Sequence, residues 1–191
     1  MVGQAPHALL AEPSHDELSL QSYVSTLRMH ILNDIGGGLR GVYDNSVKPA
    51  FESEKGRAPK DEHEVRRAMM KNGYCRTWSS MMRSCQEMIW DSIIPSIERA
   101  QPNLNTRAEK LAKKPRGSLI LDPSLKPPPY TTACDIHLMP GNYHTERGGY
   151  DVSQGMLYDR GVYVYAAGNG GPLGDTIGRS MAEHLKIRFP D

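Results

Sequence analysis

The chain has 191 residues, and its 23 basic and 22 acidic side chains give a formal net charge of +1. This balance gives no reason to expect nucleic acid or a membrane surface as a partner. No stretch approaches the roughly 20 apolar residues that a membrane-spanning helix needs, and residues 1–16 lack the basic-then-apolar pattern of a signal peptide. The sequence therefore predicts a cytoplasmic protein.

The cysteines agree with that location. They are Cys75, Cys85 and Cys134, an odd number with no CxxC pair. This usage disfavours a disulfide framework or a structural zinc site and is typical of a reducing compartment.

In chain order, composition and periodicity divide the sequence into four parts. Residues 1–15 are expected to form a disordered arm and residues 16–114 a helical domain. Residues 115–150 follow as a Pro-rich linker with a polar loop, and residues 151–191 as a helical segment. The expected fold class is mainly α: a helical N-terminal domain, a loop-rich segment and two C-terminal helices, with little strand.

The front of the helical domain carries clear start and stop signals. The first helix is predicted to begin at Asp16, an acceptable N-cap, and to end or break at the glycines in positions 36–38. A second helix is expected over residues 39–55, with a kink at Pro49. The D-x-x-E sequence Asp61–Glu64 is a capping box for a third helix.

The strongest helix signal covers residues 74–99, where Pro95 is expected to kink or end the helix. Methionines in its apolar stripe indicate plastic core packing, and a Met-rich ligand groove is the alternative. Trp78 and Trp90 are twelve positions apart, about 120° on an ideal helix, which leaves one of them free to face a neighbouring surface. The stripe consists of Tyr74, Trp78, Met81, Met82, Cys85, Met88, Ile89 and Ile93.

After this helix, the helical periodicity is weak up to residue 150 and becomes clear again from Asp151. Residues 104–114 read as a weak basic helix, and residues 117–121 as one short strand. Asp151 and Gln154 then form a second capping box, for a helix to Ala167. A strand over residues 162–166 is the alternative.

A last helix is expected from Asp175 to Arg188. Its apolar residues recur at helical spacing, so we expect Ile177, Met181 and Leu185 to be buried.

The chemistry-capable residues gather in the irregular stretch before the helix that Asp151 begins. Asp135, His137, His144 and Glu146 lie there, and three interpretations stay open. On an extended backbone Asp135 and His137 point the same way, and with His144 they would suit a divalent metal. Alternatively, the histidines satisfy buried backbone groups in the loop.

In the third interpretation, which we favour, neutral histidines and Tyr143 orient a polar small molecule, and one histidine acts as a general base.

Two arginines in the C-terminal helices have their own expected partners. Arg160 is expected to form a surface pair with Asp159. Arg179, early in the last helix, could meet a carboxylate.

Two long runs read DIHLMPGNYHTE and YDVSQGMLYDRGVYVYAAGNGGPLGDTIGRS. They resemble the region just ahead of the donor-binding domain in a family of bacterial class I S-adenosylmethionine (SAM)-dependent methyltransferases. Three upstream runs resemble the same family, so the similarity covers nearly the whole chain from about residue 18. They read FESEKGRAPKDEHEVRRAMM, YCRTWSSMMRSCQEMIWD and RGSLILDP.

The resemblance implies that SAM is the methyl donor and that it is bound mainly outside this chain. In the family, a Rossmann-like domain with a glycine-rich turn follows this region, and the present sequence reaches HLKIRFPD, where the first strand of that domain would start. The implied partner is therefore a C-terminal SAM-binding domain or subunit. The implied roles of the front region are to shape the substrate pocket and to cover the active site, and a homodimer stays open.

The residues expected to bind the small-molecule substrate come from composition. They are Asp135, His137, Tyr143, His144, Tyr158 and Arg179, with His137 and His144 as the candidates for catalysis. Two other functions remain alternatives: a self-sufficient metal-dependent enzyme that uses Asp135, His137 and His144, and a non-catalytic helical interaction module.

Overall fold

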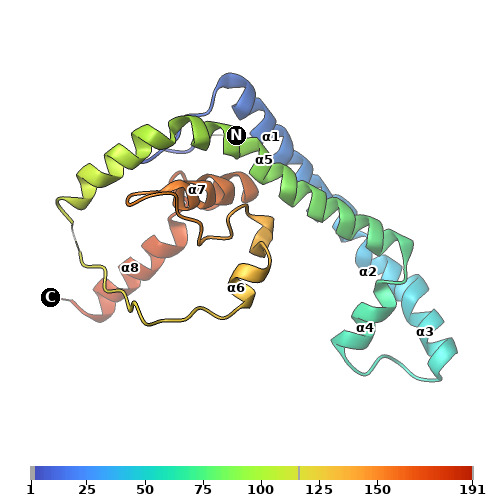
Figure 1. Cartoon of the computed structure of the whole chain (residues 1–191). Coiled ribbons are helices and arrows are strands. Elements are labelled where there is room, and N and C mark those ends of the chain that lie inside the picture. The colour runs from blue at the N-terminus through green and yellow to red at the C-terminus, as the bar shows by residue number, and fades with distance from the viewer. Residues whose placement is uncertain (1–2, 116, 191) are drawn as a thin grey trace. The chain divides into compact units, whose positions relative to one another are not determined.

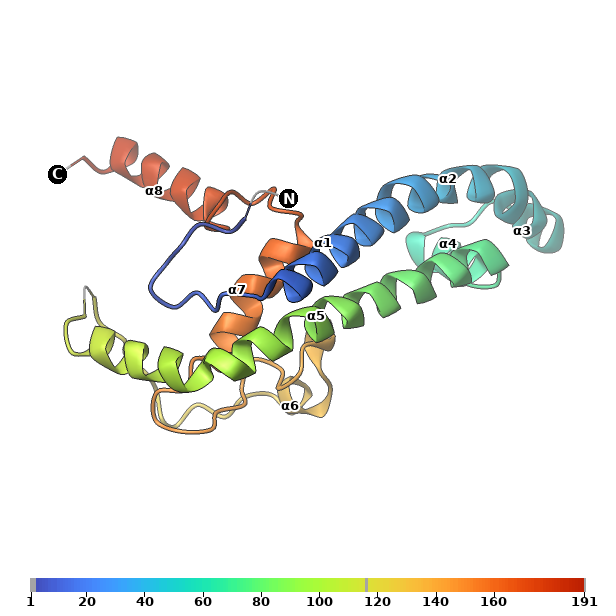
Figure 2. The ribbon, with the colours of Figure 1, turned by 90° about the horizontal axis from the view of Figure 1, so that it is seen from above.

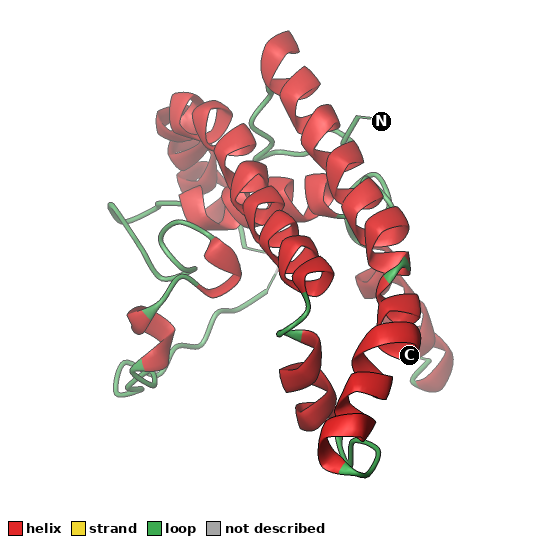
Figure 3. Cartoon of the chain, turned by 90° about the vertical axis from the view of Figure 1, so that its right-hand side faces the viewer, coloured by secondary structure: helices red, strands yellow, loops and turns green. Residues whose placement is uncertain are grey.

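The structure, a computed structural model, describes residues 3–115 and 117–190. These residues form helices joined by turns and irregular segments, and none of them lies in a strand (Figures 1 and 3). The expected mainly α class is therefore confirmed. The α-helices are α1 (His15–His30), α2 (Leu39–Val42), α3 (Lys48–Lys55), α4 (Glu62–Met69), α5 (Gly73–Ala112), α6 (Tyr130–Ala133), α7 (Ser153–Tyr165) and α8 (Thr176–Arg188).

The strand predicted over residues 117–121 is wrong, and of the two interpretations of residues 162–166 the structure has the helix, not the alternative strand. Residues 117–121 are irregular, and Leu119 and Ile120 are 82% and 90% exposed. A strand needs a partner for its backbone groups, and the described residues offer none. Residues 162–165 form the end of α7, and the amide of the C-cap residue Ala166 donates to the carbonyl of Val162 at 2.9 Å.

The chain divides into two compact units. The larger unit contains residues 1–25 and 86–191, and the smaller unit contains residues 26–85. The boundary falls within α1 and within α5, so each unit holds part of both helices.

The smaller unit stays helical where the glycines in positions 36–38 were expected to break it. A π-helical stretch, Ile31–Ile35, leads through the glycines into α2. Trp78 donates its indole N–H to the Ile31 carbonyl at 3.2 Å, and Tyr74 donates its hydroxyl to the Ile35 carbonyl at 2.7 Å. The glycines make room for these rings, since a Cβ at Gly38 would lie 3.1 Å from Cζ of Tyr74.

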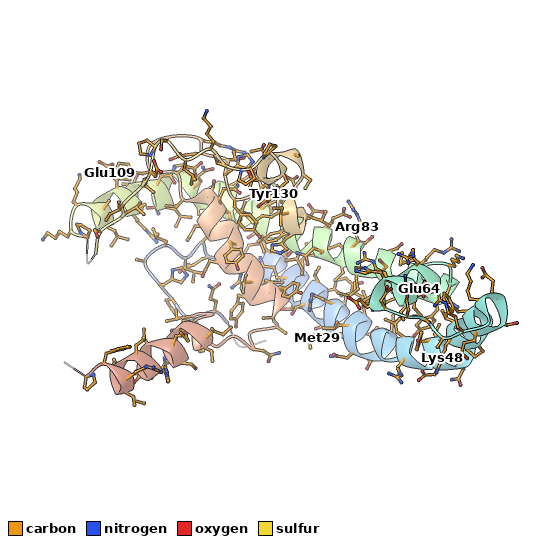
Figure 4. All side chains as sticks on the ribbon, turned by 90° about the horizontal axis from the view of Figure 1, so that it is seen from below. Met29, Lys48, Glu64, Arg83, Glu109 and Tyr130 are labelled. Atoms are coloured by element: carbon orange, nitrogen blue, oxygen red, sulfur yellow. The ribbon has the colours of Figure 1, made fainter. Side chains whose placement is uncertain are left out.

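Two predictions for the end of the smaller unit have clear outcomes. The carboxylate of Asp61 accepts from the Glu64 amide at 2.8 Å, which confirms the N-cap of α4. Glu64, labelled in Figure 4, accepts from Arg57 and from the Lys60 amide, and these hydrogen bonds lower its pKa to about 2. Pro49 does not interrupt the helical run: α3 directly follows the π-helical turn Tyr43–Val47, and Pro49 is its second residue.

In the larger unit, α1 begins at His15, one residue before its predicted cap Asp16. Ser14, not Asp16, makes the capping box: its hydroxyl accepts from the Glu17 amide at 3.3 Å, and Glu17 accepts from the Ser14 amide at 2.6 Å. Glu17 also pairs with Arg99 of α5 at 2.7 Å, which lowers the glutamate pKa to about 2.

The helix α5 continues through Pro95 and Pro102 to Ala112, so Pro95 does not end the helix, and of the two expected effects only a kink stays a prediction. Burial on both sides of the prolines explains this, because tertiary packing stabilises a helix more than local propensity does. Ile93, Ile97 and Leu104 are all 2% exposed or less. Within the predicted apolar stripe of α5, Cys85 and Ile89 are as buried as Ile93. Its three methionines are half-buried, and Tyr74 at its start is exposed.

The helix α7 lies against α1 and α5 in both ribbon views (Figures 1 and 2). Arg160 on α7 is only 4% exposed, so the predicted surface pair with Asp159 is wrong. Its guanidinium donates to the Gln21 side-chain oxygen at 2.6 and 2.9 Å and to that of Gln4 at 3.0 Å. Burial lowers the pKa of Arg160, and these neutral acceptors satisfy its N–H groups.

The segment before α1 is irregular over residues 3–14, within the range where a disordered arm was expected. Its described residues nevertheless contact the larger unit. Gln4 is 8% exposed and donates to the Asp159 carboxylate at 2.6 Å, and Ala11 is 4% exposed.

Candidate functional site

A pocket of about 330 Å³ lies in the larger unit, between α5, α7 and the loop that precedes α7. The α7 residues that line it follow the spacing i, i+3, i+4, i+7, and those on α5 the spacing i, i+4, so each helix presents one face. Charged side chains are absent from the lining. Its residues are Gln86, Trp90, His137, Tyr143, Tyr158, Gly161, Val162 and Tyr165.

Trp90 packs against α7 because residue 161 has no side chain. A Cβ at Gly161 would lie 2.8 Å from Cη2 of Trp90 and closer to a neighbouring ring carbon. Any other residue would push the indole away from the helix. The indole N–H then donates to the His137 carbonyl at 2.8 Å, and the Gln86 amide donates to the same oxygen at 3.2 Å. Two side chains of α5 thus fix the backbone at His137.

The loop that carries His137 has an unusual backbone. His137 and Tyr143 have φ angles of 59° and 67°, in the left-handed region that L-residues rarely adopt. Side chains hold this conformation: the buried Asn142 accepts from the Ile136 amide at 2.8 Å, and Gln154 accepts from the Tyr143 amide at 3.0 Å. Such conformations gather at ligand sites, where the surrounding structure maintains them.

This arrangement brings together a polar pair and an aromatic ring. Nδ1 of His137 and the hydroxyl oxygen of Tyr143 are 2.5 Å apart. The Tyr143 ring packs edge-on against Tyr158, with ring centres 5.6 Å apart. Burial, and then the neighbouring Tyr158, raise the pKa of Tyr143, so its phenol keeps its proton at neutral pH. The pocket therefore offers a hydrogen-bonding pair, His137 and a protonated Tyr143, among aromatic rings.

Of the six residues predicted to bind substrate, the structure brings three together: His137, Tyr143 and Tyr158. The other three do not line this pocket. Asp135 and His144 are exposed on the loop, and Arg179 is exposed on α8.

The alternative metal site is not formed. No group of three His, Cys, Asp or Glu side chains within residues 3–115 and 117–190 could hold a metal ion. The prediction assumed an extended backbone from Asp135 to His137, but His137 adopts a left-handed conformation and its Nδ1 contacts Tyr143. Asp135, His137 and His144 are therefore not a ligand set.

Sequence reasoning missed five lining residues, Gln86, Trp90, Gly161, Val162 and Tyr165. Helical spacing held part of the signal, since Gly161, Val162 and Tyr165 follow Tyr158 on one helix face. The two α5 residues had no such signal, because only the packed structure places α5 beside α7. The expectation that one tryptophan faces a neighbouring surface fits Trp90.

No α-helix in the described part of the chain is long and apolar enough to cross a membrane. Comparison with protein-family models, curated proteins and solved structures finds no match to this chain. The methyltransferase resemblance therefore stays a prediction, and function has to be argued from the pocket.

Proposed function

We propose that this chain supplies the substrate-binding part of a SAM-dependent methyltransferase that acts on a small molecule. The observation that carries the proposal is the aromatic pocket that encloses the His137–Tyr143 pair, since small-molecule sites are typically apolar with a few placed polar groups. The resemblance of the loop and of α7 to a methyltransferase front region supports the same choice. Those two segments supply six of the eight lining residues.

In methyl transfer from SAM, the main role of the protein is to position the substrate. An O, N or C atom of the substrate attacks the methyl carbon of SAM: the new bond to carbon forms, the carbon–sulfur bond breaks, and sulfur keeps the electron pair. The acceptor must also lose a proton, and His137 is placed to receive it as a general base. The aromatic walls would orient the substrate and exclude water.

The methyl donor would be held by another domain or subunit. Class I donor sites use a glycine-rich turn after a strand, and the described residues contain no strand. A calorimetric titration of this chain with SAM should therefore give no binding heat. Micromolar binding of SAM to this chain would contradict this assignment.

The activity itself can be tested with the gene. Coding DNA next to codon 191, in the same frame or in a neighbouring gene, should encode a strand followed by a glycine-rich turn. The chain produced together with that region should transfer a labelled methyl group from SAM to a small molecule. His137→Gln should lower kcat by about 10²-fold or more, the range of general-base catalysis, whereas the exposed His144→Gln should not. No methyl transfer to any small molecule would exclude the proposal.

A further inference from the structure

Among the described residues, no Lys, Arg, Asp or Glu lines the pocket that we propose for the substrate, and the phenol of Tyr143 stays protonated. An anionic ligand would lose its hydration and gain no counter-charge, which is costly. This lining favours a ligand that is neutral when it binds.

The walls favour a flat ligand. Trp90, Tyr143, Tyr158 and Tyr165 line the space with aromatic rings. Aromatic pairs gain roughly 0.5–1.5 kcal/mol beyond the area they bury. The volume of about 330 Å³ is near the lower end of small-molecule pockets. One ring or two fused rings would fit this space, and a long chain would not.

The polar groups favour a hydroxyl on that ring. The N–H groups of Gln86 and Trp90 already donate to the His137 carbonyl, so they are committed within the protein. Nδ1 of His137 is committed to Tyr143, which leaves Nε2 for the ligand. When Nδ1 carries the imidazole proton, Nε2 is an acceptor, and a hydroxyl is the matching donor.

We propose that the pocket binds an uncharged hydroxyarene of one or two fused rings, with its ring against Trp90 and Tyr158 and its hydroxyl donating to Nε2 of His137. The inference rests on the proposed function, because it makes the hydroxyl oxygen the methyl acceptor. In that step the oxygen bonds to the methyl carbon of SAM, the carbon–sulfur bond breaks, and the hydroxyl proton moves to His137. The products are an aryl methyl ether and S-adenosylhomocysteine.

Calorimetric titration of the full chain with matched probes tests the ligand class. The probes are 2-naphthol, naphthalene, 2-naphthoate and a naphthyltrimethylammonium salt. We expect 2-naphthol to bind most tightly, with about a tenfold loss without the hydroxyl, the usual size of one hydrogen bond. The carboxylate should bind more weakly still. Tighter binding of the anion or of the cation, or no binding of 2-naphthol, would overturn the proposal.

A pair of variants ties binding to this pocket. Tyr158 and Tyr150 are 49% and 50% exposed, and only Tyr158 lines the pocket. Tyr158→Ala should weaken 2-naphthol binding about tenfold or more, whereas Tyr150→Ala should leave it unchanged, with circular dichroism to confirm that both fold. Equal effects of the two variants would place binding elsewhere and overturn the proposal.

The proposed function and the hydroxyarene assignment can be contradicted separately. If 2-naphthol does not bind while the chain and its SAM-binding region methylate another class of molecule, the hydroxyarene assignment is wrong and the proposed function stands. If 2-naphthol binds as expected but no methyl transfer occurs to it or to any other molecule, the proposed function is wrong.

Discussion

The helices α7 and α8 have the same length, 13 residues, and opposite surroundings. α7 lies against α1 and α5 and buries Leu157, Arg160 and Val164 (Figure 2). None of the α8 residues is buried, and Ile177, where burial was expected, is 83% exposed. Apolar periodicity therefore predicts that a segment is helical, but not that its apolar face has a partner.

The largest expected difference between the two helices concerns buried charge. Val164→Asp would place a carboxylate at a position with 0% exposure, at a cost of about 4 kcal/mol or more, and we expect the larger unit to unfold. Ile177→Asp on α8 should change the free energy of unfolding by less than about 0.5 kcal/mol. Urea denaturation followed by circular dichroism measures both.

Val164→Ala is a milder substitution at the same position. This variant should fold, and its free energy of unfolding should fall by about 2 kcal/mol. Similar losses for Val164→Asp and Ile177→Asp would show that α8 is as buried as α7.

A second difference concerns the two glycines Gly161 and Gly178. Gly161→Ala should cost about 1–3 kcal/mol, because its methyl group would overlap the Trp90 ring. Gly178→Ala meets no atom within 4 Å, so it should stabilise α8 by roughly 0.5–1 kcal/mol through helix propensity. Thermal denaturation gives both values. A neutral Gly161→Ala would mean that Trp90 does not rest on α7.

The smallest difference lies just before the two helices. Asp151 is not the N-cap of α7 as predicted, since that position is Val152, but its carboxylate accepts from the amides of Ser153 and Arg147, both at 2.8 Å. Asp175 is the N-cap of α8 and makes no side-chain cap bond. Asp151→Ala should cost about 1 kcal/mol through the lost hydrogen bonds, and Asp175→Ala a few tenths. Chemical denaturation at pH 7 compares the two variants, and equal losses would contradict the difference between the two aspartates.

The same carboxylate predicts a pH dependence. Burial of Asp151 opposes ionisation, but hydrogen bonds from Ser153, Arg147 and Gln101 outweigh it and lower the pKa. Because the unfolded chain has the higher pKa, the contribution is complete above about pH 4 and is lost as the pH falls below that value. The wild type and Asp151→Ala should therefore converge in stability towards pH 2.

Local rules succeeded where the partner is a neighbour in sequence. Asp61 caps α4 as its D-x-x-E pattern predicted, and Gly56 ends α3 in a left-handed conformation with φ of 67°. The local rules failed where a side chain instead binds a residue that is distant in sequence. Gln154 was expected to complete a capping box with Asp151, but its side chain binds the Tyr143 amide and the Pro140 carbonyl.

The sequence by itself determined that this protein is helical and that its polar, His- and Tyr-rich loop lies before the helix containing Tyr158, because helix periodicity and loop composition are local properties. Only the tertiary structure decided that His137, Tyr143 and Tyr158 share one pocket while Asp135, His144 and Arg179 lie outside it. That choice depends on Trp90, 47 positions before His137, which holds the loop through one hydrogen bond and rests where Gly161 leaves space. Sequence spacing contains no information about such a contact.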